Sequence, residues 1–216
     1  VTISHIEITH SAKMPVLYIC QSSTVTADHV NVHDVPYTLL ACDGASHLVI
    51  KDSEFHKSEK NGVHVSDQSY IEITNCQISD TAYPGISVND SQCIIKNNTL
   101  SNVGQNCISI FSSKEFIVEN NSIRNCGATA ISCERSQGIV NNNKMNEIHG
   151  NGVHVSNNAN VQITNNEIND ADYPGIAIVS NANATIKKNR ICRIKINGIC
   201  SRGAKNVHME DTEIID

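Results

Sequence analysis

The chain has 216 residues, of which 39% are hydrophobic, 18% charged and 4% aromatic, with no tryptophan. This length is sufficient for one substantial core. The formal net charge of −6 argues against a nucleic-acid partner, because phosphate binding needs clustered lysines and arginines. No apolar run approaches membrane-spanning length and no segment resembles a signal peptide, so we predict no membrane partner.

The sequence repeats itself with a period of 22 or 23 residues. Aligned on the short motif Gly-Ile-x-Val, it divides into coils that begin at positions 1, 24, 47, 70, 93, 115, 138, 160 and 183. A partial tenth coil follows from position 205. Because only single-residue insertions separate the repeats, the register hardly drifts. The repeat therefore predicts nine stacked coils and part of a tenth.

Apolar residues recur at three fixed positions of each coil. These columns run from Ile3 to Met209, from Ile8 to Ile214 and from Leu17 to Ile199. Apolar and polar residues alternate within each short run, which is the pattern of a half-buried strand. The columns predict an all-β fold, a single-stranded right-handed parallel β-helix with three short strands per coil. We expect one domain over residues 1–216, cut from a longer protein, with open strand edges that need capping or that associate.

A polar column accompanies the apolar ones. It consists of an asparagine at the same place in five successive coils: Asn75, Asn97, Asn120, Asn142 and Asn165. Stacked at the ~4.8 Å spacing of neighbouring strands, identical amides can donate to one coil and accept from the next. The column therefore predicts an asparagine ladder in the middle coils. On this interpretation, glycosylation of the Asn-x-Ser/Thr sequons at Asn97 and Asn120 would be incompatible with folding.

Two recurring patterns carry a resemblance to a known family. The runs Asn-Gly-Val-His-Val-Ser and Val-x-Ile-x-Asn-Asn-x-Ile resemble the parallel β-helix repeat of pectate-lyase-like proteins, and the resemblance covers the whole chain. It implies the fold, whereas the superfamily mixes polysaccharide lyases, hydrolases and epimerases with repeat modules that have no known catalysis. The chain lacks the paired aspartates and the Gly-His-Gly element of polygalacturonases, and it lacks the Asp-Pro-His element of alginate epimerases.

Part of the repeat is duplicated. Residues 61–88 and 151–178 align without a gap, and 15 of the 28 positions are identical. His64 and His154 are counterparts in this alignment, four coils apart, which corresponds to about 19 Å at four strand spacings. Two equivalent points on one face suit a repetitive binding surface better than a single catalytic centre.

The resemblance implies that ligands are handled on the solvent face of the Gly-Ile-x-Val strands. The outward residues of these strands, here called the His–Ser strip, are Tyr18, Ala41, His64, Ser87, Ser109, Ser132, His154, Ala177 and Cys200. Its middle is small and hydroxylated, so a chain-like ligand could approach closely. We predict a binding surface formed by His64, Ser87, Ser109, Ser132 and His154. Tyr83 and Tyr173 could line one side of it, although their Tyr-Pro-Gly context is also ordinary turn chemistry.

A catalytic hypothesis uses the turn that follows this strand. Asp67 and Asp90 occupy matching turn positions in adjacent coils, and Arg135 lies in the same column two coils later. Stacked carboxylates could share a Ca²⁺ ion or a raised pKa, and an acidic pair with an arginine would suit a lyase acting on uronates. Solvated turn charges are the alternative. The missing tryptophan argues against a sugar cleft built on aromatic stacking.

The nine cysteines are odd in number, and no two of them share a column in neighbouring coils. Cys42, Cys93 and Cys133 are expected to face inward as small hydrophobes. Free thiols favour a reducing compartment, so we expect an intracellular location.

Three functions remain open. The first is a non-catalytic recognition module that binds a polysaccharide or a protein through its outward sheet face. The second is a polysaccharide lyase, hydrolase or epimerase, and the third is a structural spacer. Association end to end or face to face is compatible with each.

Overall fold

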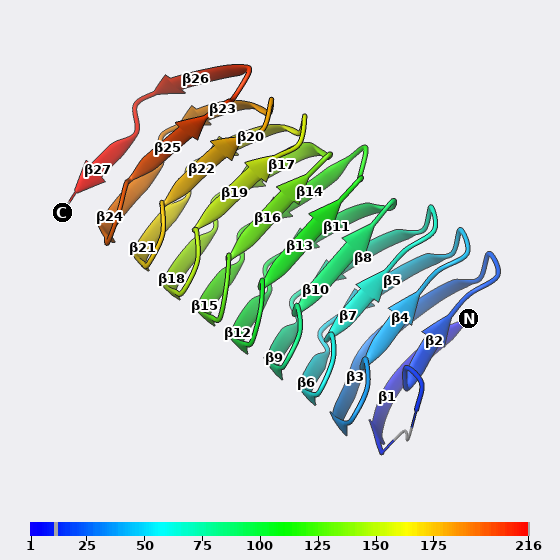
Figure 1. Cartoon of the computed structure of the whole chain (residues 1–216). Helices are drawn as coiled ribbons and strands as arrows, with labels where there is room; N and C mark the ends of the chain where they lie inside the picture. Colours follow the sequence, from blue (N-terminus) through cyan, green and yellow to red (C-terminus); the bar gives the residue numbers. More distant parts are fainter. Residues whose placement is uncertain (11–12, 216) are drawn as a thin grey trace.

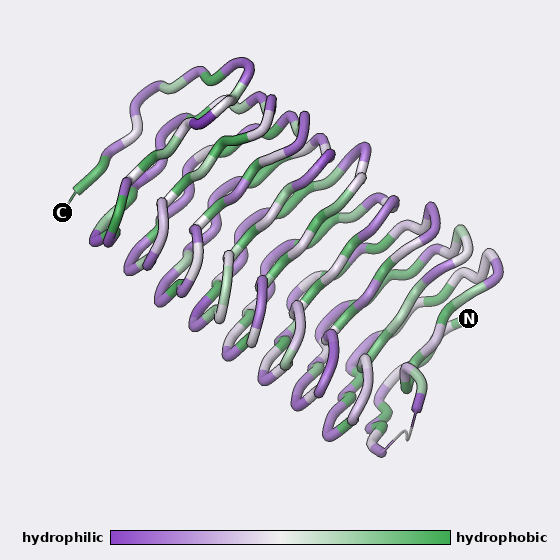
Figure 2. The backbone as a smooth tube through the Cα atoms, viewed as in Figure 1, coloured by the Kyte–Doolittle hydropathy of each residue, from purple (hydrophilic) through white to green (hydrophobic). Residues whose placement is uncertain are grey.

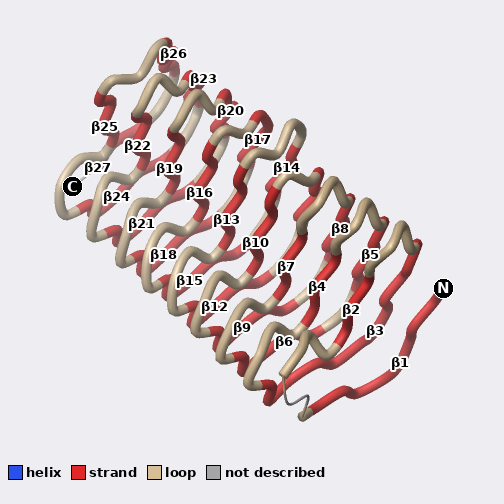
Figure 3. The backbone as a smooth tube through the Cα atoms, turned by 45° about the vertical axis from the view of Figure 1, so that its right-hand side comes forward, coloured by secondary structure: helices blue, strands red, loops and turns tan. Residues whose placement is uncertain are grey.

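The described residues form a solenoid of stacked coils whose N- and C-terminal coils lie at opposite ends (Figure 1). The computed structural model describes residues 1–10 and 13–215, and its regular elements in these ranges are strands. No helix in these ranges is long and apolar enough to cross a membrane. The predicted all-β solenoid is confirmed, with three strands per coil and loops at the corners (Figure 3).

The Gly-Ile-x-Val segments form a nine-stranded parallel sheet within the described residues. Its strands are β2 (Leu17–Ile19), β4 (Leu40–Cys42), β7 (Val63–Val65), β10 (Ile86–Asn89), β13 (Ile108–Phe111), β16 (Ile131–Glu134), β19 (Val153–Ser156), β22 (Ile176–Val179) and β25 (Ile199–Arg202). This sheet carries the His–Ser strip on its outer face.

The other two strands of each coil form two ladders that join into one 18-stranded parallel sheet. They are joined because β1 (Thr2–Thr9) and β3 (Thr24–Val35) continue through the corner between the ladders. The first ladder continues with β5 (His47–Lys51), β8 (Tyr70–Thr74), β11 (Gln92–Lys96), β14 (Phe116–Glu119), β17 (Gln137–Asn141), β20 (Asn160–Thr164), β23 (Asn183–Lys187) and β26 (Asn206–Glu210). The second continues with β6 (Glu54–Ser58), β9 (Gln77–Thr81), β12 (Thr99–Val103), β15 (Ser122–Cys126), β18 (Lys144–Ile148), β21 (Glu167–Ala171), β24 (Arg190–Ile194) and β27 (Glu213–Ile215).

The three predicted apolar columns are confirmed by the pairing register. Ile95, for example, lies between Ile73 and Val118, and Ile131 lies between Ile108 and Val153. In the middle coils these side chains are fully buried. Figure 2 shows the resulting alternation of hydrophobic and hydrophilic residues along the strands. The core is therefore a narrow aliphatic stack that runs the length of the solenoid.

The predicted asparagine stacking is confirmed, and Nδ2 of Asn142 donates to Oδ1 of Asn120 at 2.8 Å in the predicted column. The continuous buried ladder, however, lies one residue later. Asn75 and its column occupy the left-handed backbone region at the corner (φ 56° for Asn75) and their side chains are exposed. A left-handed residue breaks the in–out alternation, so the following residue faces inward. The buried ladder consists of Asn98, Asn121, Asn143, Asn166 and Asn189. In this ladder, Oδ1 of Asn121 accepts from the backbone N–H of Asn98 at 2.9 Å and from its Nδ2 at 3.0 Å.

The placement of Asn97 and Asn120 also corrects the expectation about glycosylation. Both side chains are exposed at the corner rather than buried in the ladder. The argument that a glycan at either sequon would prevent folding was wrong for that reason.

One cysteine pair contradicts the expectation that the thiols are free. Cys107 and Cys126 form a disulfide with a Cα–Cα distance of 5.8 Å. They belong to different columns, one just before β13 and the other at the end of β15, and they meet across the same corner. Comparison within columns could not detect such a pair. Cys42, Cys93 and Cys133 are buried inward as predicted.

The two end coils expose apolar side chains. Ile6 is 37% exposed at one end, and Met209 and Ile214 are 56% and 54% exposed at the other. Association through the ends stays a prediction.

Candidate functional site

The His–Ser strip forms one continuous row across the nine-stranded sheet, as predicted. His64 lies between Ala41 and Ser87 in the pairing register, and His154 lies between Ser132 and Ala177. Each strip residue lies between two inward-facing residues of its strand, so the pleat of the strand points its side chain outward. The row presents small side chains at its centre and an imidazole on each side of them.

The two imidazoles are half-buried, and both have the same unusual feature. Nδ1 of His64 and Nδ1 of His154 are buried and have no hydrogen-bond partner among residues 1–10 and 13–215. Burial lowers the pKa of each ring below its usual range, since the sheet desolvates the charged form. Burial therefore favours the neutral form of both rings. Because a buried N–H without a partner is rarer than an unpaired acceptor, we assign the tautomer with hydrogen on Nε2, which faces solvent.

The charges nearest these rings are acidic. Asp67 and Asp43 act on His64 and partly oppose the fall in its pKa, and Glu134 acts in the same way on His154. An anionic ligand at either ring would be repelled by these carboxylates. The strip can donate hydrogen bonds, but its surroundings do not favour a uronate.

Sequence reasoning placed Tyr18 on the strip without giving it a role. Its hydroxyl donates to Oδ2 of Asp43 at 2.6 Å, and this bond raises the pKa of Tyr18 to about 12. Asp43 directly follows β4, two residues after Ala41, which pairs with His64. Reading the second outward position of each strand would have revealed Asp43.

The proposed catalytic residues Asp67, Asp90 and Arg135 all lie at the turn after the nine-stranded sheet. All three have left-handed backbone. The N–H of Gln68 donates to the carbonyl of Asp90 at 2.8 Å, so Asp67 and Asp90 lie in adjacent coils. Among the described residues, none of the three side chains takes part in an ion pair. The Arg135 guanidinium instead lies 5.3 Å from the centroid of the Phe111 ring. The turn aligns these residues in one column without bringing the arginine to the carboxylates.

Tyr83 and Tyr173 precede β10 and β22, on the side of the sheet opposite the Asp67–Asp90 turn. They are 41% and 54% exposed, and the Lys60 ammonium lies 4.5 Å from the centroid of the Tyr83 ring. Neither makes a contact that assigns it a ligand, so their place in a binding surface stays a prediction.

A concave surface that sequence reasoning missed lies over the first ladder. The turn that leads into β11 contains one residue fewer than the turn that leads into β8, since Gln92 pairs with Tyr70. The turn into β17 is shortened in the same way, since Gln137 pairs with Asn160. Each short turn lies between two longer ones and leaves a hollow, one beside Asp90 and one beside Arg135.

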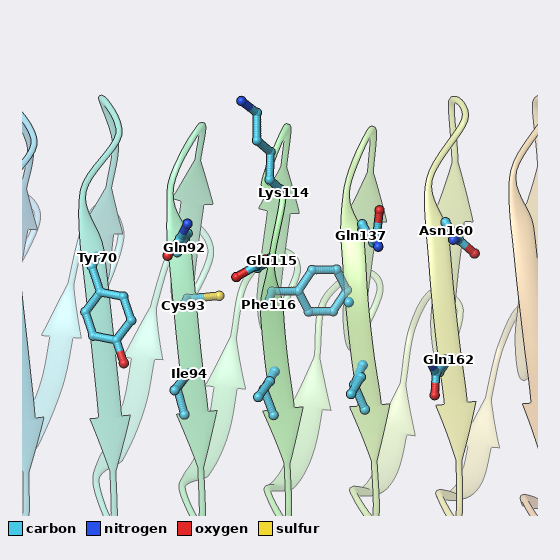
Figure 4. Close-up of a pocket in the computed structure, with 13 residues that line it drawn as sticks. Tyr70, Gln92, Cys93, Ile94, Lys114, Glu115, Phe116, Gln137, Asn160 and Gln162 are labelled. Atoms are coloured by element: carbon cyan, nitrogen blue, oxygen red, sulfur yellow. The ribbon is translucent and has the colours of Figure 1, made fainter.

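Behind these hollows, a groove of about 370 Å³ crosses β8, β11, β14, β17 and β20 (Figure 4). We call it the Ile117 groove. It is lined by Tyr70, Gln92, Cys93, Ile94, Lys114, Glu115, Phe116, Ile117, Gln137, Gly138, Ile139, Asn160 and Gln162. The Phe116 ring fills the space beneath Gly138, where an added Cβ would lie 2.6 Å from the ring. The one-residue shortening belongs to the repeat spacing, whereas the hollow that it leaves depends on the heights of the neighbouring turns.

A group of metal-binding atoms occurs near the N-terminal end. Donor atoms of Asp28, His29 and Asp52 lie within 4.8 Å of one another. The Lys51 ammonium is 3.1 Å from Asp28, and Nδ1 of His29 is 2.7 Å from the same carboxylate. The Asp28 carboxylate is therefore already engaged by the Lys51 ammonium. Ca²⁺ binding by Asp67 and Asp90 stays a prediction. The two turn carboxylates alone would supply few of the six to eight oxygen ligands that the ion takes.

Comparison with known proteins identifies the fold. Residues 15–146 and 129–216 match the family model described as "Right handed beta helix region", which confirms the predicted handedness. No curated protein matches the sequence.

Two kinds of solved structure are similar in three dimensions. A double mutant of the periplasmic alginate epimerase AlgG superposes with a TM-score of 0.84 at 13% identity, covering 88% of this chain and 50% of that one. The A-module of the mannuronan C-5 epimerase AlgE4 of Azotobacter vinelandii gives a TM-score of 0.54 at 13% identity, covering 99% and 78%. The chain thus spans about half the length of AlgG. At this identity the likeness concerns the fold alone.

Proposed function

This chain belongs to the right-handed β-helix family, and we propose that it is a non-catalytic recognition module that binds a neutral polysaccharide along the His–Ser strip. In this proposal His64 and His154 donate hydrogen bonds to ligand hydroxyls from Nε2. Ser87, Ser109 and Ser132 donate and accept between them. Tyr83 and Tyr173 flank the chain-like ligand.

One observation carries this proposal: both histidines have a buried Nδ1 without a partner, at equivalent positions of the strip. The coil does not require histidine there, since other coils have alanine or serine at the same register position. A buried polar atom without a partner costs about 1–3 kcal/mol, so its occurrence twice needs a reason beyond folding. Two neutral donors about 19 Å apart suit a polymer rather than a small metabolite.

The acidic surroundings support a neutral ligand over a uronate. Asp43 and Asp67 lie near one ring and Glu134 near the other, and at ordinary ionic strength charges within about 8–10 Å are poorly screened. A protein partner with basic side chains would also suit these charges. If the strip binds such a protein instead of a polysaccharide, sugars should not displace the protein from it.

The enzyme alternative uses Asp67, Asp90 and Arg135, with Ca²⁺ as a possible cofactor. Its support is the likeness of the fold to alginate epimerases. An elimination or epimerisation of a uronate needs positive charge at the carboxylate and a base at the neighbouring carbon. The two histidines could serve as bases, but no cation lies beside either ring within the described part of the chain. We therefore place the enzyme second.

The test is binding of the purified chain to a panel of neutral and acidic polysaccharides by affinity gel electrophoresis, with and without Ca²⁺. We expect retardation by at least one neutral polysaccharide. Replacing both histidines by alanine should weaken it by about tenfold or more, if each loses one hydrogen bond of 0.5–1.5 kcal/mol. The exposed His208→Ala variant is the matched control and should bind normally.

Mass spectrometry of the same incubations separates binding from catalysis. Cleaved, unsaturated or epimerised products that disappear in Asp90→Ala would establish the enzyme in place of the module. Absence of retardation by every polysaccharide would refute the proposed function.

A further inference from the structure

The Ile117 groove lies on a different sheet from the His–Ser strip, and its floor is apolar. Ile94 pairs with Ile117, and Ile117 pairs with Ile139, so three isoleucines point outward in one row. They are half-buried beneath the neighbouring side chains. In flanking coils the same row has Glu72 and Gln162. The apolar stretch is therefore confined to the three coils under the groove.

Four polar side chains around this floor make no hydrogen bond within the described part of the chain, although the Tyr70 ring stacks on that of His47 at 4.5 Å. Within the described residues, the side chains of Tyr70, Gln92, Gln137 and Asn160 make no hydrogen bond. Figure 4 shows the three amides along the upper part of the groove, with the Tyr70 ring at one end. These groups line the groove and are available to a ligand.

The next outward row shows that free amides are not a general property of this sheet. Lys96 pairs with Glu119 at 3.2 Å, and Nδ2 of Asn141 donates to the same carboxylate at 2.7 Å. Oγ1 of Thr164 then donates to Oδ1 of Asn141 at 2.8 Å. In this row the polar side chains of four successive coils bond to one another, whereas the amides of the groove make no such bonds.

The chemistry of the groove identifies its ligand class. The charges of Lys114 and Glu115 cancel, so the lining favours a neutral molecule. Carboxamides both donate and accept, which matches sugar hydroxyls, while an apolar floor suits the C–H face of a sugar ring. The volume of about 370 Å³ lies at the lower end of the range of about 300–1,000 Å³ for small-ligand sites.

An extended peptide fits less well. Peptides that bind sheets usually add a strand to a free edge and gain main-chain hydrogen bonds. The strands under the groove are paired on both sides, so this mode is blocked.

We propose that the Ile117 groove is a binding site for a short neutral oligosaccharide, separate from the His–Ser strip. Ile94, Ile117 and Ile139 contact the sugar rings, Gln92, Gln137 and Asn160 bond to hydroxyls, and Tyr70 closes one end. The site does not depend on the proposed function of the strip.

The experiment is a glycan array of neutral and uronate oligosaccharides, followed by ¹⁵N NMR titration of the chain with each binder. We expect at least one neutral glycan to shift the side-chain amide signals of Gln92, Gln137 and Asn160. The Gln92→Ala/Gln137→Ala variant should bind about tenfold more weakly or worse, by the loss of two hydrogen bonds. Gln77→Ala, an exposed glutamine on β9, is the control and should leave binding unchanged.

The outcomes separate the two sites. Binding in the groove should persist in the His64→Ala/His154→Ala variant, which removes the donors of the strip. Titration that shifts the strip alone, binding of uronates in preference to neutral glycans, or an array without a neutral binder would each overturn the groove proposal. The groove amides shifting with a random heptapeptide mixture instead of sugars would overturn it as well. A melting temperature equal to that of the parent chain shows that the double glutamine variant is folded.

Discussion

The two duplicated blocks, residues 61–88 and 151–178, have the same fold and register but different surroundings. Both contribute a histidine to the strip with a buried, unpartnered Nδ1. At the following turn the first block has Asp67 and the second has Asn157. The copies have kept the histidine, which coil geometry does not require, and have changed the charge beside it. The donor at this position is therefore a better guide to function than the turn carboxylate.

The blocks also differ where they border the Ile117 groove. Tyr70 in the first block and Asn160 in the second are counterparts, and they lie at opposite ends of the groove. Its floor comes from the coils between them. The groove is thus a property of the intervening coils and their shortened turns, and duplication of the block alone would not create it.

The largest effect is expected from breaking the core between the two blocks. Ile131→Asp would put an unpaired carboxylate in a column where Ile131 is fully buried, so unfolding free energy should fall by more than about 4 kcal/mol. Urea denaturation followed by circular dichroism measures the change. Ser132→Asp, on the outward neighbour, should stay within about 0.5 kcal/mol. An unchanged Ile131→Asp protein would contradict the register.

The disulfide between the blocks should have the next largest effect. Cys107 and Cys126 are 19 residues apart in sequence, and in the chain-entropy description such a closure contributes about 3 kcal/mol. The Cys107→Ala/Cys126→Ala variant should lose roughly this much in the same denaturation experiment. Adding a reductant should destabilise the parent chain and leave the variant unaffected. Equal sensitivity of both proteins to reductant would contradict the bridge.

A smaller effect distinguishes the blocks at the buried ladder. The first has Cys76 where the second has Asn166. Asn166→Cys would leave the backbone carbonyl of Val140 without its donor, and a loss of about 1–3 kcal/mol is expected. Asn97→Asp is the control, because Asn97 is exposed in the corner column, its side chain makes no hydrogen bond among the described residues, and aspartate also tolerates its left-handed backbone. If the control cost more than Asn166→Cys, the ladder would lie in the column first predicted.

The smallest effects concern pH. Since burial lowers the pKa of His64 and His154, their contribution to stability is present above pH ~6.5 and is lost as pH falls through their folded pKa. His33 is the opposite case, because its bonds to Asp34 and Glu7 raise its pKa. Its contribution is full below pH ~6.5 and is lost as pH rises through the folded pKa. NMR titration of the ring protons should resolve both directions.

Two substitutions exchange the turn charges of the two blocks, and the same NMR titration measures the effect on the pKa of each histidine. Asp67→Asn should lower the pKa of His64 further, and Asn157→Asp should raise that of His154. No change in either ring would mean that the turn charge is fully screened.

Sequence patterns predicted the coils, the three apolar columns and the strip because these depend on residue periodicity alone. The ladder was displaced by one residue because left-handed corner residues, such as Asn97 at φ 57°, interrupt the alternation from which inward positions are counted. The Cys107–Cys126 bridge joins two columns across a corner, which periodicity does not relate. The Ile117 groove depends on the heights of neighbouring turns and on which amides remain unbonded, and both require coordinates.

The buried asparagine ladder has a mechanical consequence. Its rungs connect each coil only to its neighbours. The first asparagine rung joins Asn98 to Cys76, and the coils before it have Cys76 and Ser53 in place of asparagine. Under tension applied to the two ends, the chain should peel from the N-terminal side one coil at a time. Each release frees about 23 residues, which extend to roughly 80 Å. A force trace should therefore show a regular sawtooth that begins at low force and rises when the first rung is reached.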